Sequence, residues 1–208
     1  MSASVHDLPL RSFTPDAWAR QVLRRPLELL SDHAHLEKKA AANALELVSR
    51  WPQPDPPEQW VAAMTAIARE ETEHLGQVNR LLNRRGGRLS RHHRNPYAAA
   101  LRELVRRGQG ANELMDRLMV SALIEARSAE RFEVLGRITE DRELQRLYRD
   151  LWASEHGHYR TFLNLAQPLA PAAEFEQRWQ DLLDAEARIL ADQPPGPRMH
   201  GGCEPPED

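Results

Sequence analysis

Two short stretches decide the fold of this chain: Glu71-Thr-Glu-His74 and Glu155-His-Gly-His158. Both read Glu-x-x-His, so on a helix the two side chains of each motif lie one turn apart on the same face. The rest of each face is apolar, with Met64 and Ile67 before the first motif. An ionised carboxylate among apolar side chains is costly unless a partner compensates its charge. Both motifs therefore predict long helices that carry a polar site inside a core.

Each motif has a partner glutamate on the helix that precedes it. Glu37 and Glu125 also lie in stripes of small or apolar residues. Glu37 lies about 13 residues before a proline-rich break at 51–57 and Glu71 about 14 after it, so both lie at the same height along their helices. The match of Glu125 and Glu155 about their own turn is looser. Six side chains are therefore predicted to converge on one slice: Glu37, Glu71, His74, Glu125, Glu155 and His158.

Apolar periodicity and helix-ending residues predict helices along the whole chain. The expected caps are Thr14, Ser31 or Asp32, and Thr139. The predicted ranges are about 16–23, 31–50, 58–83, 96–107, 111–135, 139–167 and 172–191. Two tight hairpins joined by the long crossover at 86–110 indicate an all-α, ferritin-like four-helix bundle with additional short helices, spanning residues 1–193. Residues 194–208 are rich in proline and glycine, which predicts a flexible tail.

The predicted donor set indicates a carboxylate-bridged site for two metal ions. Four carboxylates and two imidazoles without sulfur suit iron or manganese better than zinc or copper(I). Two iron ions are favoured, because few protein ligands per metal leave positions at which O2 can bind as a co-substrate. The ligands alone leave manganese open. The alternative is that these buried acids and histidines form ion pairs without a metal. Two Glu-x-x-His motifs at matching heights, each with a partner glutamate, argue against this alternative.

Other polar positions near these residues are predicted to face solvent. One group forms a charged face on the third long helix: Arg127, Glu130, Arg131 and Glu133. A second group lies beside Glu37: His35, Lys38 and Lys39. His33 precedes Glu37 by one turn, and its role is open between an outer partner of that ligand and a neighbour of the stripe.

The bulk composition favours a cytoplasmic protein without membrane spans. There is one cysteine, no apolar run near the ~18 residues of a membrane helix, and no apolar signal segment at the N-terminus. The net charge is −3, yet residues 84–94, here called the basic segment, contain no acid. This pattern indicates either a polyanion-binding face or a solvated loop. Its arginines are Arg84, Arg85, Arg88, Arg91 and Arg94.

Around the six predicted ligands, the sequence resembles the MiaE-type tRNA hydroxylases. The similar stretches are residues 31–41, 70–75, 123–132 and 154–159, within a resemblance that covers about residues 24–191. It implies a non-haem di-iron monooxygenase that hydroxylates the isopentenyl group of 2-methylthio-N6-isopentenyladenosine in tRNA. It also implies an external electron donor and carries the six metal ligands over to the same six positions.

Two other functions fit the same residues less well. A ferroxidase or another di-iron oxidase would share the ligands, and an iron-storage cage would need a large symmetric shell rather than a monomer or small homo-oligomer. A tRNA-binding module with a purely structural metal would bind RNA without consuming oxygen.

Overall fold

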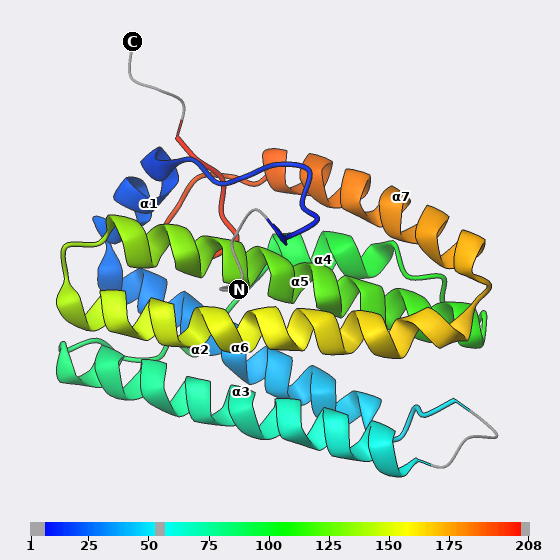
Figure 1. Cartoon of the computed structure of the whole chain (residues 1–208). Coiled ribbons are helices and arrows are strands. Elements are labelled where there is room, and N and C mark those ends of the chain that lie inside the picture. Colours follow the sequence, from blue (N-terminus) through cyan, green and yellow to red (C-terminus); the bar gives the residue numbers. More distant parts are fainter. Residues whose placement is uncertain (1–6, 53–56, 205–208) are drawn as a thin grey trace. The chain divides into compact units, whose positions relative to one another are not determined.

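The computed structural model describes residues 7–52 and 57–204, and its regular elements in these ranges are helices (Figure 1). No helix in the described part of the chain is long and apolar enough to cross a membrane. The elements, in chain order, are α1 (Asp16–Leu23), α2 (Pro26–Leu47), α3 (Glu58–Arg84), α4 (Pro96–Glu103), α5 (Ala111–Ile138), α6 (Arg142–Ala166), the 3-10 turn η2 (Gln167–Leu169) and α7 (Ala172–Ala191).

The chain divides into two compact units, and residues 25–94 form one of them. This unit, the α2–α3 unit, is a hairpin of two long helices that pack along each other. Trp60 is buried and donates from Nε1 to the carbonyl of Leu47 at 2.7 Å, which ties the two helices together near their break. The break itself lies partly outside the described residues. Apolar side chains that face inward hold the hairpin together by burial, including Leu29, Leu30, Met64, Val78 and Leu82.

The second unit contains the chain up to residue 24 and from residue 95 onward. Its centre is the α5–α6 hairpin, and α1, α4 and α7 pack on α5 (Figure 1). Asp141 caps α6 by accepting hydrogen bonds from the main-chain N–H groups of Glu143 and Leu144. Asn95 caps α4 in the same way, through Ala98. Because several elements cover α5, this helix is buried on nearly all sides.

Three predicted helix starts differ from the structure. The first long helix begins at Pro26, about a turn before Ser31, because proline is pre-shaped for the first turn of a helix. Asp141 rather than Thr139 caps α6. Thr14 does not cap α1, since its hydroxyl and main-chain N–H both donate to the carboxylate of Glu130. The tertiary partner supersedes the local cap in this case.

The C-terminal segment also differs from its prediction as far as residue 204. Met199 and His200 are buried, and Arg131 donates to the main-chain carbonyls of Met199 and Gly201. The segment approaches its neighbours so closely that a Cβ on Gly202 would lie 2.0 Å from the carbonyl oxygen of Gln193. Composition cannot reveal this docking, because main-chain carbonyls make it. Residues 205–208 lie outside the described part.

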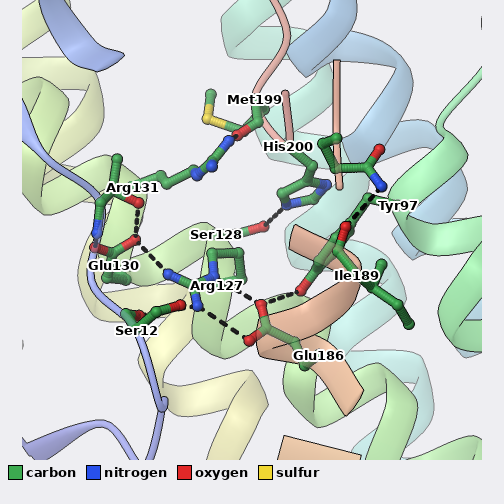
Figure 2. Close-up of polar contacts among 12 residues, drawn as sticks. Ser12, Tyr97, Arg127, Ser128, Glu130, Arg131, Glu186, Ile189, Met199 and His200 are labelled. Carbon is green, nitrogen blue, oxygen red and sulfur yellow. Dashed lines mark hydrogen bonds and ion pairs between the residues drawn. The ribbon is translucent and has the colours of Figure 1, made fainter. Parts of the chain in front are cut away.

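Three of the four residues predicted to form a charged face on the third long helix, Arg127, Glu130 and Arg131, are buried instead (Figure 2). Glu133 is partly exposed. Arg127 is 0% exposed and Glu130 is 1% exposed. Arg127 donates to both carboxylate oxygens of Glu186 on α7, at 2.8 and 3.1 Å, and to Glu130 at 3.1 Å. Tyr97 on α4 donates to Glu186 at 2.9 Å. These residues form a closed internal network that joins α4, α5 and α7, and we call it the arginine network.

Candidate metal centre

The α2–α3 unit brings together Glu37, Glu71 and His74, as the register about the first hairpin predicts. One ligand atom from each lies within 4.8 Å of the others. His74 Nδ1 lies 3.6 Å from Glu37 Oε2 and 3.6 Å from Glu71 Oε2. All three side chains are buried. The apolar stripes on α2 and α3 therefore carry a polar trio to the interior of the hairpin, and we call it the first trio.

The electrostatics of the first trio show a strong preference for added positive charge. Burial alone would raise the pKa of Glu37, but His33, His74 and Glu71 together hold this pKa below its usual value. Burial alone would lower the pKa of His74, but the carboxylates of Glu37 and Glu71 raise it to about 10. His33 Nε2 lies 2.5 Å from Glu37 Oε1, which assigns it as the outer partner of that carboxylate. A cation between these carboxylates would neutralise their negative charge, as a protonated imidazole does in its absence.

The second unit brings together Glu125 on α5 with Glu155 and His158 on α6. One ligand atom from each lies within 4.8 Å of the others, and all three side chains are buried. Apolar side chains flank this second trio along α5 and α6, among them Ala122, Ala129, Leu151 and Phe162. The looser register predicted for this hairpin is therefore close enough to place the three groups side by side.

The residues of both trios fit a hard divalent metal ion. Each trio offers two carboxylates and one imidazole, so it carries two negative charges when the imidazole is neutral. Oxygen-rich donor sets of this kind suit iron and manganese. A buried pair of carboxylates without a cation would be costly, and the raised pKa of His74 expresses that same cost.

The basic segment lies in the α2–α3 unit, and the arginines predicted to contact phosphate are at least partly exposed to solvent. Arg84, Arg88, Arg91 and Arg94 are exposed, and Arg85 is half-buried. The prediction that His35 faces solvent is wrong, since its side chain is buried and its ring stacks on that of His93. The sequence predicts Asp32 only as a possible helix cap and does not reveal that it contacts His93. Their contact spans 61 residues along the chain, and no local periodicity signals it.

The helical fold and the two carboxylate–histidine trios define a class: a ferritin-like helical protein with a candidate carboxylate metal centre. Among solved structures, the chain is similar to "Protein 43 with aldehyde deformylating oxygenase activity from Synechococcus", with a TM-score of 0.84 and 34% identity. The match covers 93% of this chain and 96% of that one. The ferritin-like helical fold predicted from the sequence is thereby confirmed.

Sequence comparison then identifies the family. The MiaE family, described as tRNA-(MS[2]IO[6]A)-hydroxylase, matches residues 2–201, and the chain belongs to this family. A relative from Pseudomonas putida named tRNA 2-(methylsulfanyl)-N(6)-isopentenyladenosine(37) hydroxylase is 38% identical, over 91% of this chain and 90% of its own length. A relative of the same name from Salmonella typhimurium is 29% identical, over 91% and 86%.

Proposed function

We propose that this chain hydroxylates the isopentenyl group of 2-methylthio-N6-isopentenyladenosine in tRNA. One oxygen atom of O2 enters a C–H bond of that group and the other leaves as water. The balance requires two electrons from an external donor and two protons. The observation that carries the proposal is the presence of two buried carboxylate–histidine trios in a chain of the MiaE family. Because its substrate is tRNA, we place the enzyme in the cytoplasm.

We further propose that the two trios together hold two iron ions, with Glu37, Glu71, His74, Glu125, Glu155 and His158 as ligands. Two single glutamates and two Glu-x-x-His motifs form the ligand pattern of di-iron carboxylate bundles. Bound iron supplies the activation of O2, which no amino-acid side chain can provide. The protein holds the metal charge with its carboxylates, and His33 fixes the orientation of Glu37 through their hydrogen bond. Apolar neighbours keep bulk water from the reacting carbon.

The arginines of the basic segment are proposed to bind tRNA phosphates: Arg84, Arg85, Arg88, Arg91 and Arg94. Arginine matches phosphate oxygens with two parallel donors. We expect the triple change of Arg88, Arg91 and Arg94 to alanine to weaken tRNA binding. It should also reduce the slope of log affinity against log salt by ~0.7–0.9 for each arginine–phosphate pair that the change removes. Titration of labelled tRNA at several salt concentrations measures both quantities. Unchanged affinity and slope would place the RNA elsewhere.

The central test of the proposed function is nucleoside analysis. The iron-loaded protein is incubated with O2, a reductant and tRNA that carries the isopentenyl base, and the digested nucleosides are separated by mass. We expect a product heavier by one oxygen atom, and label from 18O2 should enter it. A His158→Ala variant serves as the matched control on the same tRNA. Absence of the product from a preparation that contains iron and consumes O2 would reject the proposal.

A different di-iron oxidase is the second candidate, and the similarity to a protein with aldehyde deformylating oxygenase activity favours it. An aldehyde is small and uncharged, so this reaction gives no role to the exposed arginines. Conversion of an aldehyde, without action on tRNA, would support it. A ferroxidase cage predicts a large assembly, whereas the hydroxylase is proposed to be a monomer or small homo-oligomer. Light scattering separates these two states.

A further inference from the structure

A cluster of polar residues fastens the basic segment to α2. His93 lies between two α2 residues: its Nε2 is 2.8 Å from Asp32 Oδ1, and its Nδ1 is 2.8 Å from Lys39 Nζ. A lysine ammonium has only donors, so Nδ1 must accept from Lys39. The proton of the neutral ring therefore lies on Nε2, which donates to Asp32. His93 is thus held at both nitrogens, and its side chain is only 8% exposed.

A second set of contacts fixes the chain three residues before His93. His35 Nε2 donates to the carbonyl of Ser90 at 2.9 Å. The main-chain N–H of Ser90 donates to Ser31 Oγ at 3.2 Å. The rings of His35 and His93 stack with centroids 4.7 Å apart and an interplanar angle of 4°. We call Asp32, His35, Lys39, Ser90 and His93 the histidine clamp.

The histidine clamp and the first trio use two different faces of the same stretch of α2. At 100° per residue, Asp32, His35 and Lys39 fall within about 60° of one another. His33 and Glu37 fall roughly 100–160° away from these three residues, on a different face of the helix. One rigid length of helix therefore carries a proposed metal ligand on one side and the anchor of the basic segment on the other. Figure 1 shows the connection that leaves α3 and turns back beside α2.

We propose that the histidine clamp positions the arginines of the basic segment for tRNA, so that its five residues are positioning residues for substrate binding. This inference rests on the proposed function. A free segment of this length would lose conformational freedom on binding RNA, and that loss would reduce the affinity. The clamp holds Ser90 and His93 beforehand, while Arg88, Arg91 and Arg94 remain exposed around them. The structure thus separates the contacts that fix the segment from the side chains that meet phosphate.

The principal test is His93→Ala, measured by tRNA titration and steady-state kinetics on the iron-loaded protein. We expect the affinity for tRNA to fall roughly 3- to 10-fold, because the segment must then become ordered when it binds, and the entropy lost in ordering weakens binding. KM for tRNA should rise with kcat nearly unchanged. The slope of log affinity against log salt should also remain unchanged, because all arginines of the basic segment can still contact phosphate. The change of Arg88, Arg91 and Arg94 to alanine instead lowers the slope, so the two variants distinguish positioning from phosphate contact.

A matched pair and a rescue make the test specific. Lys39→Ala and Lys38→Ala each remove one positive charge from α2, but only Lys39 donates to His93. We expect a larger loss of affinity with Lys39→Ala. His93→Gln keeps one acceptor and one donor on a side chain of similar reach, so it should recover much of the affinity that His93→Ala loses.

Each outcome decides the proposal. If Lys38→Ala and Lys39→Ala lower the affinity equally, the loss comes from the missing positive charge rather than from the contact with His93, and the proposal is overturned. Wild-type affinity and KM in His93→Ala would overturn it as well, while hydroxylation by the unaltered protein would leave the proposed function standing. If His93→Ala fails to fold or to bind iron, Asp32→Asn replaces it, because this change keeps the size of the side chain and weakens the same bond.

Discussion

Two groups of buried charges lie on successive turns of α5, and they are neutralised in different ways. Glu125 belongs to the second trio, in which carboxylates and an imidazole meet. Arg127 and Glu130, less than two turns further on, belong to the arginine network, in which a guanidinium bridges two carboxylates (Figure 2). Both groups are almost inaccessible to solvent.

The difference between them teaches how to distinguish structure from chemistry in a buried cluster. The arginine network contains its own cation. Burial would lower the pKa of Arg127, but Glu186 and Glu130 outweigh this effect and hold the pKa above its usual value. Both carboxylates are therefore ion-paired with a cation that the fold itself supplies. In the first trio the carboxylates instead raise the pKa of an imidazole, His74. In this trio a bound metal ion would supply the positive charge that the proton on His74 supplies in its absence.

The largest expected effect is the loss of activity when a ligand is removed. Glu125→Ala or His158→Ala should lower hydroxylation by more than ~100-fold, since even an outer partner of a metal ligand costs 10- to 100-fold. Affinity for tRNA should change little, because both side chains are buried. Iron content, expected at about two per chain in the unaltered protein, and turnover of labelled tRNA check this prediction.

A variant in the arginine network provides the control for that experiment. Glu186→Gln also removes a buried carboxylate from the second unit, but it should leave iron content and turnover intact at temperatures where the protein is folded. Wild-type turnover by a folded His158→Ala variant would remove the trio from the mechanism. Loss of iron in Glu186→Gln at low temperature would remove the distinction between the two groups.

The next effect concerns stability. Arg127→Met keeps most of the side-chain volume but leaves Glu186 and Glu130 without their shared cation. Breaking a buried pair in this way costs about 3–5 kcal/mol, which corresponds to a fall in Tm of roughly 10 °C for a chain of this size. Thermal unfolding followed by circular dichroism measures it.

A double variant tests the cause of that loss. Arg127→Met combined with Glu186→Gln should cost less than the sum of the two single changes, because the two groups interact directly. Simple additivity would show that the guanidinium acts through packing rather than through charge.

The sequence predicts the two groups unequally well, for a physical reason. Glu125 is identifiable because one acid in an apolar stripe contradicts the pattern of a helix face. The prediction that Arg127, Glu130 and Arg131 face solvent is wrong, although they form the polar face of an amphipathic helix, which ordinarily meets solvent. That rule fails on α5, since α1, α7 and the segment at 199–202 cover the polar face. Their partners outside α5 lie 59 to 116 residues away along the chain.

Helix positions are more predictable than helix ends. The ranges of α3 and α7 agree with the predicted ones within a residue, since proline and glycine bound them. Leu45 fits the inner stripe of α2 by its spacing but is 59% exposed, near the end of that helix. The predicted caps at Thr14 and Thr139 fail where a tertiary partner or a second candidate cap competes. Local signals place the helices, and a predicted helix end shifts where a tertiary contact or a second local cap competes.

The smallest expected effect is a dependence of stability on pH at the edge of the second unit. Asp116 on α5 accepts hydrogen bonds from Arg106 and Arg178 at 2.9–3.0 Å. Burial would raise the pKa of Asp116, but the two guanidinium groups hold it below its ordinary value of 3.8. A depressed pKa stabilises the fold above the unfolded-state value and loses that contribution as pH falls through the folded-state value. The stability contributed by Asp116 should therefore be complete at pH 7. It should begin to fall at about pH 4 and be lost fully only below the lowered folded-state pKa.

Asp116→Asn isolates this contribution from that of the other carboxylates. The variant should be less stable than the unaltered protein at pH 7, and the gap between their urea midpoints should close as pH falls below about 4. We expect a smaller gap than for Arg127→Met, because Arg106 and Arg178 are 26% and 20% exposed and solvent screens their charges. Added salt should further reduce the difference in stability between Asp116→Asn and the unaltered protein. The loss of stability in Arg127→Met should not depend on salt, because that network is fully buried. A gap that stays constant from pH 7 to pH 3 would mean that Asp116 acts by shape alone. The contrast between carboxylates paired with arginine and the carboxylates of the two trios would then have no electrostatic basis at this site.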